Sequence, residues 1–138
     1  MESYKHVVQY YETDKMGITH HSNYIRWMEE ARIDFLRQIG WEYKKLEEMG
    51  IISPVVSVDC KYKRPTTFSD EIFIDVKVSE YKSMKFSLHY DMKDVNGKVV
   101  CEAESVHCFV NKDGRPVRLL KENPAFHEVL SNLVSSGV

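Results

Sequence analysis

The chain has 138 residues, of which 43% are hydrophobic and 29% are charged, values that are ordinary for a globular domain. Its formal net charge is −2, so no overall field attracts nucleic acid. No apolar run approaches the roughly 20 residues of a membrane span, and the polar N-terminus does not resemble a secretory signal peptide. We therefore expect one domain over residues 1–138, located in the cytoplasm, without a nucleic-acid partner.

The first part of the chain is predicted to hold a strand, an irregular loop and a long helix. Residues 4–11 have the composition of a short strand, and residues 12–17 turn irregular. From Ser22 to Ile39 the apolar residues recur at steps of three and four, which predicts an amphipathic helix with a wide apolar stripe. Gly40 is suited to end this helix, and a second, shorter helix is expected in residues 42–49.

In the second half of the chain the apolar period changes to two, which predicts strands. The alternation covers four segments: residues 54–65, 71–80, 84–92 and 98–110. Asn96-Gly97 suits a tight hairpin turn, and residues 122–133 are expected to form a short closing helix that starts near Pro124. Short links make neighbouring strands antiparallel, and the long helix is the only large apolar partner for a sheet. We therefore expect an α+β fold in which an antiparallel five-stranded sheet wraps around one long central helix.

The three cysteines, Cys60, Cys101 and Cys108, are odd in number and lack C-x-x-C spacing. This pattern argues against a disulfide framework and against a zinc knuckle. Each cysteine lies in a strand-like segment, so we interpret all three as small, buried or half-buried apolar side chains.

The stretch "YETDKMGITHHSNY", residues 11–24, concentrates side chains that can do chemistry. The carboxylate of Asp14 can act as a general base on water or attack a carbonyl directly. Gly17 would let the loop turn sharply and bring its backbone close to a substrate. His21 lies where the long helix should begin, and Tyr24 on its first turn could supply a hydroxyl.

A structural interpretation stays open for each of these residues. Asp14 could cap the helix or stabilise a turn, Gly17 could serve that turn alone, and Tyr24 could be ordinary helix core. His21 could be a structural histidine. A metal site formed by Asp14, His20 and His21 is disfavoured, because adjacent histidines rarely point at one ion and no further ligand is nearby in sequence.

The order of strand, D-x-x-G loop, long helix and four strands is similar to the hotdog fold. Asp14 and Gly17, followed by His21, Asn23 and Tyr24, resemble the motif of the 4-hydroxybenzoyl-CoA thioesterase family. Within that family the closest similarity is to the branch of acyl-CoA thioesterases associated with the Tol–Pal system. The resemblance covers most of the chain and is fairly specific, because acid, glycine, histidine and tyrosine all fall at the family's spacing.

This resemblance implies an enzyme that hydrolyses an acyl-CoA to a free acid and CoA, without a metal or other cofactor. It implies that Asp14 is the general base or nucleophile and that the backbone amide of His21 faces the thioester carbonyl. Family members are homodimers or homotetramers with active sites between subunits, so the same assembly is expected. Lys15 and Met16 stand where the branch often has small residues, which puts the identity of the acyl group in doubt.

The phosphates of CoA require cations, and two segments could supply them. One contains Lys63 and Arg64, and the other contains Lys82 and Lys85 around an expected turn. The second segment matches the position where the family tends to place basic residues near the nucleotide. Surface lysines also block the pairing of strand edges, so either segment could have only that purpose.

Two rival functions remain open. A hotdog dehydratase would need a histidine paired with an acid to move protons at the acyl chain, and His21 keeps this possibility open. A non-catalytic acyl-CoA or lipid-binding module would use the same pocket without turnover. Asp14 discriminates between binding and catalysis, because a pure binder does not need a carboxylate facing a thioester.

Overall fold

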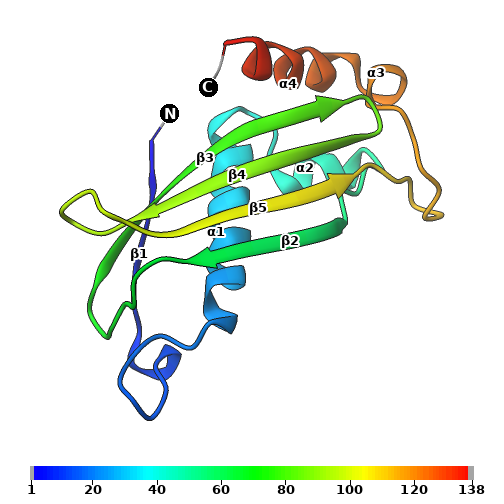
Figure 1. Cartoon of the computed structure of the whole chain (residues 1–138). Coiled ribbons are helices and arrows are strands. Elements are labelled where there is room, and N and C mark those ends of the chain that lie inside the picture. The colour runs from blue at the N-terminus through cyan, green and yellow to red at the C-terminus, as the bar shows by residue number, and fades with distance from the viewer. Residues whose placement is uncertain (1, 137–138) are drawn as a thin grey trace.

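The computed structural model describes residues 2–136 of the 138. An antiparallel five-stranded sheet with the order β1-β3-β4-β5-β2 curves around helix α1 (Figure 1). The strands are β1 (Tyr4–Val7), β2 (Val55–Tyr62), β3 (Glu71–Lys82), β4 (Lys85–Lys93) and β5 (Val99–Cys108). One strand precedes the long helix and four follow it, so the architecture predicted from the sequence is confirmed.

Helix α1 (Ser22–Gln38) forms where the apolar residues recur at steps of three and four. Its stripe faces the sheet and makes the centre of the core, since Trp27, Phe35 and Leu36 are at most 2% exposed. The helix ends at Gln38, just before Ile39, and Gly40 follows with a φ of +87°. That left-handed conformation costs glycine nothing, which explains why the helix stops there.

The inner face of the sheet supplies the rest of the core. Along β4 every second side chain is buried, from Phe86 to Met92, and β5 alternates in the same way. Strand β2 differs because it forms an outer edge of the sheet, and most of its side chains are exposed. A register shift between Val55 and Ser57 also breaks the predicted alternation, so Val55 rather than Val56 shares a cavity with Val58.

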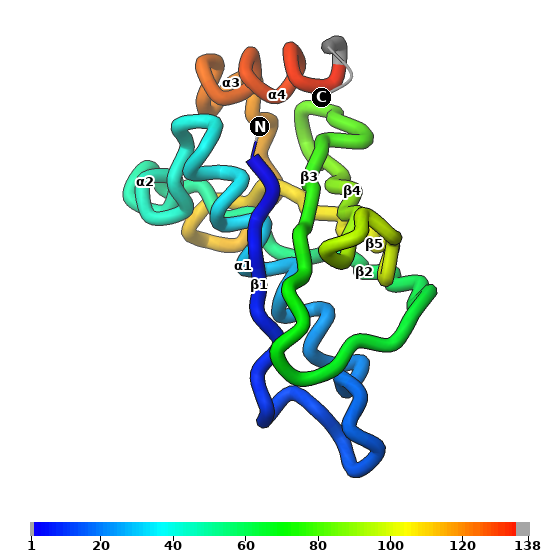
Figure 2. Tube along the Cα trace, turned by 90° about the vertical axis from the view of Figure 1, so that its left-hand side faces the viewer, coloured from blue at the N-terminus to red at the C-terminus, as the bar shows by residue number. Residues whose placement is uncertain are grey.

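Shorter helices close the ends of the molecule. Helix α2 (Tyr43–Glu48) confirms the predicted second helix, and α3 (Leu119–Glu122) leads into α4 (Pro124–Ser136). Both α3 and α4 lie at the end of the sheet where β3 turns into β4 (Figures 1 and 2). The predicted closing helix is therefore confirmed, with Pro124 as its first residue. Among the helices of residues 2–136, none is long and apolar enough to cross a bilayer.

Candidate active site

The chain between β1 and α1 forms a compact loop beside the start of the helix (Figure 2). The first strand was predicted to reach Tyr11, but β1 ends at Val7 and a short 3-10 helix follows at Tyr10–Glu12. The cause is Glu12, whose carboxylate accepts a hydrogen bond from the backbone N–H of Gln9 at 2.8 Å. This contact turns the chain out of the strand.

Glu12 also fixes the loop to the helix. Its carboxylate is 5% exposed and accepts the indole N–H of Trp27 at 2.8 Å, and it lies 2.9 Å from Nε2 of His6. Its backbone carbonyl accepts the side-chain amide of Asn23 at 2.9 Å. Burial acts to raise the pKa of Glu12, but hydrogen bonds from Gln9, Trp27 and His6 outweigh it and lower the pKa below 4.5. The ionised carboxylate is thus a buried anchor for the loop.

Asp14 and Gly17 shape the exposed part of this loop. The amide of Gly17 donates to the carbonyl of Asp14 at 3.0 Å, and the amide of Asp14 donates to the carbonyl of Ile18 at 2.8 Å. Gly17 has a φ of +81°, which glycine adopts without strain. The exposed Asp14 carboxylate accepts the backbone N–H of Met16 at 2.8 Å, its one hydrogen bond among the described residues. It can therefore still accept a proton or attack a carbonyl.

The start of α1 presents an unused hydrogen-bond donor. His21 is the N-cap residue, and its side chain does not cap the helix. The amides of Asn23 and Tyr24 donate to the carbonyls of His20 and His21 at 3.0 and 3.2 Å. The backbone N–H of His21 has no acceptor within the part of the chain that the structure describes. It is a free donor at the positive end of the helix dipole.

Asp14 and His21 line the same cavity, which has a volume of about 340 Å³. Lys63 and Arg64, which follow β2, also line it. The structure therefore brings one of the two predicted cationic segments to the loop and the helix start. Lys82 and Lys85 instead flank the β3–β4 turn at the opposite end of the sheet (Figure 1), so one chain does not bring them together with Asp14.

Tyr24 also lines the cavity, and its side chain and that of His21 both contact neighbouring residues. Tyr24 is 3% exposed, and its hydroxyl lies 3.0 Å from the Thr66 hydroxyl. Burial raises the pKa of Tyr24, so the hydroxyl stays neutral. The His21 ring stacks on that of His20 with centroids 4.3 Å apart. No hydrogen bond joins this ring to Asp14 among the described residues.

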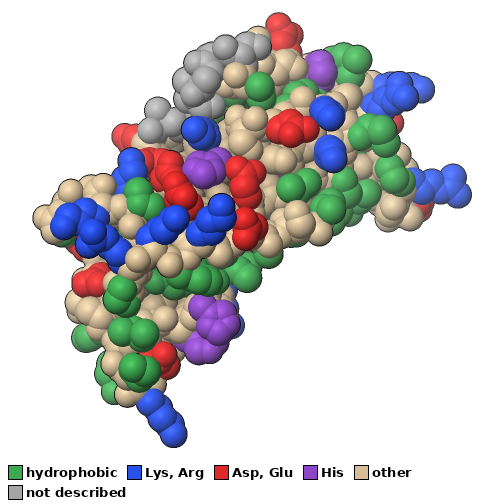
Figure 3. Space-filling model, viewed as in Figure 1, with side chains coloured by type: hydrophobic (Ala, Val, Ile, Leu, Met, Phe, Trp, Pro, Cys, Tyr) green, Lys and Arg blue, Asp and Glu red, His purple; other side chains and the backbone are tan. Residues whose placement is uncertain are grey.

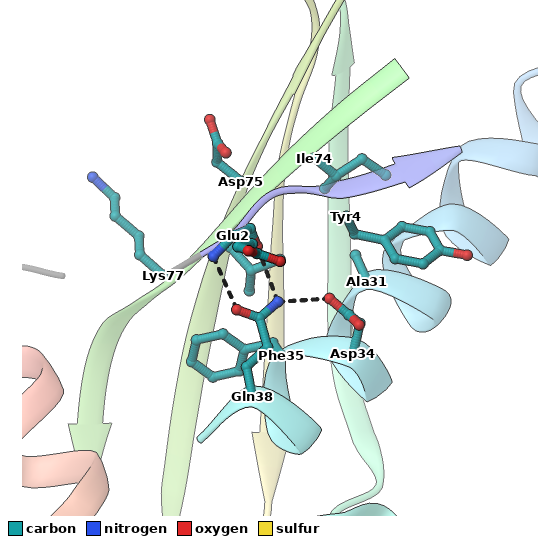
Figure 4. Close-up of a pocket in the computed structure, with 10 residues that line it drawn as sticks. Glu2, Tyr4, Ala31, Asp34, Phe35, Gln38, Ile74, Asp75 and Lys77 are labelled. Carbon is teal, nitrogen blue, oxygen red and sulfur yellow. Dashed lines mark hydrogen bonds between the residues drawn. The ribbon is translucent and has the colours of Figure 1, made fainter. Parts of the chain in front are cut away.

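A different cavity of about 210 Å³ lies on the β1 side of α1 (Figure 4). The side-chain amide of Gln38 lies across it, donating to the Asp34 carboxylate at 2.7 Å and to the Glu2 carbonyl at 3.0 Å. None of the predicted site residues lines this cavity. It lies along the middle and the end of α1, away from the helix start that carries the free His21 N–H.

Asp14, His20 and His21 do not gather as a metal-ligand set within residues 2–136. The ligand atoms that do approach one another within 4.8 Å in the described chain belong to His89, Asp91 and Glu102. These three lie on the outer face of the sheet, away from the loop and the helix start.

Comparison with known proteins places the chain in a family. A five-stranded antiparallel sheet wrapped around one long helix is the arrangement of the hotdog fold. A family model described as the thioesterase-like superfamily matches residues 8–133. The chain belongs to this superfamily, has the hotdog fold and is a thioester hydrolase.

Individual relatives agree with the family. A Bacillus subtilis protein provisionally named acyl-CoA thioesterase YneP is 32% identical over 121 residues, 87% of this chain and 88% of that protein. An Aquifex aeolicus protein provisionally named an esterase is 38% identical over 121 residues, 86% of this chain and 91% of that protein. The crystal structure of a DHNA-CoA thioesterase from Staphylococcus aureus superposes with a TM-score of 0.94 at 28% identity, covering 99% of this chain and 92% of that one. These matches do not single out the Tol–Pal-associated branch.

Proposed function

We propose that the chain hydrolyses acyl-CoA thioesters to a carboxylic acid and free CoA. The observation that carries this proposal is that Asp14, with its exposed carboxylate, and His21, with its free backbone N–H, line one cavity at the start of α1. A thioester bound between them would point its carbonyl oxygen at the N–H. Water then adds to the carbonyl carbon, the C–S bond breaks, and the sulfur leaves with a proton as the thiol of CoA.

Asp14 can promote this reaction by two routes. As a general base it takes a proton from the attacking water and later passes it to the leaving sulfur. As a nucleophile it forms a mixed anhydride that water then hydrolyses. Both routes place negative charge on the carbonyl oxygen, which the His21 N–H stabilises. One such donor is worth about 3–4 kcal/mol of transition-state stabilisation in other oxyanion holes, against about 0.3–1 kcal/mol for the helix dipole alone.

The CoA part of the substrate is supported by the cations and by the relatives. Lys63 and Arg64 lie at the cavity and can meet phosphate groups. Solved relatives at 28% and 27% identity are a DHNA-CoA thioesterase and a gentisyl-coenzyme A thioesterase. The names of these two structures and of the Bacillus subtilis relative all specify a CoA thioester as the substrate.

The rival dehydratase finds less support. Its chemistry needs a histidine paired with an acid at the substrate, and His21 makes no such pair with Asp14 among the described residues. The buried pair of His6 and Glu12 lies beneath the loop, and neither residue lines the cavity.

We also propose that the protein works as a homo-oligomer in the cytoplasm. Apolar side chains of the edge strand β2 are exposed in the single chain, among them Val55, Val56, Val58 and Tyr62. Figure 3 shows apolar side chains along this edge of the sheet. An exposed apolar edge favours pairing with a second copy.

The test measures thiol release from acyl-CoAs of short, medium, long and aromatic type by the wild type and by Asp14→Asn. Asn keeps the shape and the bond to the Met16 N–H but cannot take a proton. We expect kcat to fall by about 10²–10⁴-fold, the usual range for loss of a general base, with little change in KM. Asp113→Asn, in an exposed turn far along the chain, is the matched control and should retain full turnover.

Equal turnover by wild type and Asp14→Asn would remove Asp14 from the mechanism. If no acyl-CoA releases thiol but several bind, the protein is an acyl-CoA binding module instead.

A further inference from the structure

A histidine and three acidic side chains meet on the outer face of the sheet, opposite the face that packs on α1. His89 and Asp91 come from β4, and Glu102 and Glu104 come from β5. The register places Asp91 directly opposite Glu102 and His89 directly opposite Glu104. Two paired strands inside the sheet therefore hold all four side chains, and Figure 3 shows acidic side chains around a histidine on this face.

The neighbours of His89 leave one ring nitrogen in an unfavourable contact. Nδ1 lies 3.2 Å from Oε1 of Glu104, and Nε2 lies 3.0 Å from Oδ1 of Asp91. A neutral imidazole carries one N–H, so it can donate to only one of these two carboxylates. The lone pair of the other nitrogen then faces an oxygen that is also an acceptor. This contact needs a cation, which is either a second proton on the ring or a metal ion between the two atoms.

The surrounding carboxylates favour the metal ion over the proton. Asp91 lies opposite Glu102 on one side and opposite Asp75 of β3 on the other, and like charges in such positions destabilise a sheet. Lys93 pairs with Asp75 at 3.1 Å and Lys63 lies 3.7 Å from Glu102, but no lysine or arginine of residues 2–136 is within ion-pair distance of Asp91. One proton on the ring would leave most of this repulsion in place. A divalent ion bound by Asp91 and Glu102 would neutralise both charges.

The distances also suit a metal ion. One ligand atom from each of His89, Asp91 and Glu102 lies within 4.8 Å of the others. Two ligand atoms that are each about 2.0–2.2 Å from one Zn²⁺ ion lie roughly 3 Å apart, close to the 3.0 Å between Nε2 and Oδ1. Glu104 can then accept the N–H of Nδ1 and direct Nε2 at the ion, as carboxylates do beside many metal-binding histidines. Its other oxygen accepts the Ser79 hydroxyl at 3.1 Å, which fixes the carboxylate.

We propose that His89, Asp91 and Glu102 bind one Zn²⁺ ion on the outer face of the sheet, with Glu104 orienting the histidine. A nitrogen ligand beside two carboxylates favours Zn²⁺ over Mg²⁺ and Ca²⁺, which take oxygen ligands. The ion reaches the site through a hollow of about 240 Å³ whose lining includes His89, Glu102 and Glu104. None of the three ligands lines the proposed thioester site, so the ion joins β4 to β5 and stabilises the fold without taking part in hydrolysis.

The test titrates Zn²⁺ into the full-length protein after bound metal has been removed with EDTA. Isothermal titration calorimetry measures the binding, and we expect one ion per chain. The midpoint of thermal unfolding should rise by about 5–10 °C at a hundredfold excess of Zn²⁺ over Kd. Mg²⁺ at the same concentration should give neither effect.

Single substitutions identify the ligands. Asp91→Asn and His89→Gln should remove the calorimetric signal, and Glu104→Gln should weaken binding by about 10–100-fold, the usual cost of losing the carboxylate behind a metal-bound histidine. Asp113→Asn, in an exposed turn, and His20→Gln, in the adjacent pair of histidines before α1, are the controls and should bind as the wild type does. A variant that merely folds poorly has a low midpoint without metal but still responds to Zn²⁺, whereas a lost ligand removes the response.

The proposal is overturned if the wild type does not bind Zn²⁺, since a proton on the ring then supplies the missing charge. Binding that survives unchanged in Asp91→Asn and His89→Gln overturns it as well. Binding that is lost in His20→Gln instead places the ion beside the start of α1 and refutes the assignment to the sheet.

Discussion

Acidification should destabilise the protein through one buried histidine, His107. The ring lies on the inner face of β5, stacked on Phe86 with centroids 4.9 Å apart. Burial first, and the positive charge of Arg32 second, lower the pKa of His107 to about 4, with only a partial offset from the Ser53 backbone. An ordinary histidine in the unfolded chain has a pKa of about 6.5.

The sign and the size of the effect follow from these two values. Because the folded-state pKa is the lower one, the unfolded chain binds the proton first as the pH falls. The stabilisation by neutral His107 is therefore complete above about pH 6.5 and is lost as the pH falls toward 4. At pH 5 the unfolded histidine is almost fully protonated and the folded one is almost neutral. The resulting loss of unfolding free energy between pH 7 and pH 5 is about 2 kcal/mol.

Urea unfolding at pH 7, 6 and 5 and at one protein concentration measures this loss. His107→Gln keeps a polar group for Ser105 but cannot be protonated, so it should lose about 2 kcal/mol less than the wild type between pH 7 and pH 5. His20→Gln, which removes an exposed histidine, should behave like the wild type. If the wild type and His107→Gln lose the same free energy, the ring is protonated without penalty and the reasoning about its burial is wrong.

Two further substitutions test the loop and the cations. Glu12→Gln should lower the unfolding free energy by about 1–3 kcal/mol, because an amide cannot accept all the hydrogen bonds that the buried carboxylate accepts. Urea unfolding measures this loss, with the exposed Glu128→Gln as the control. Equal stability of the two variants would contradict the prediction. Replacing Lys63 and Arg64 by glutamine should raise KM for acyl-CoA several-fold, most at low salt, whereas the same change at Lys82 and Lys85 should raise it less. If steady-state kinetics instead show the larger rise in KM for the Lys82 and Lys85 variant, the CoA phosphates bind at the β3–β4 turn.

The periodicity of the sequence was enough to predict the fold, because apolar residues recur on the face of a helix or strand that is covered and polar residues on the face that is open to solvent. The step of three and four from Ser22 placed Trp27 and Phe35 on the buried stripe of α1, and they are buried. Strand β2 shows the limit of this reasoning. Its alternation resembles that of β4, yet Val58 is 41% exposed because no other element of residues 2–136 covers that edge of the sheet. A period of two shows that a strand has two faces, but not which partner covers them.

The cavity that forms the candidate site could be predicted where its lining residues are close in sequence. Asp14 and His21 share one loop, so their meeting at one cavity needed only the turn at Gly17. The choice between the cations at Lys63 and those at Lys82 depends on the strand order, which local patterns do not contain.

Buried charged residues were the main omission. Arg32 looks like part of a solvated helix face, since its neighbours in sequence are charged or apolar in the ordinary mixture. Glu12 stands beside two exposed tyrosines and looks like surface. No local signal indicates that the indole of Trp27 and the ring of His6, from two other elements, meet its carboxylate.

Two carboxylates two residues apart therefore have opposite environments in this loop. Glu12 is buried, and its oxygens are engaged by donors from three residues, so it is shielded from a substrate water. Asp14 is exposed at the cavity and accepts a single described backbone N–H, so it can still bind a proton. A base carried by an exposed loop must nevertheless be held near the helix start to act on the carbonyl. The ionised, buried Glu12 supplies that restraint through Trp27 of α1, so under the proposed mechanism Asp14 is held in place by another residue and keeps its own carboxylate for the reaction.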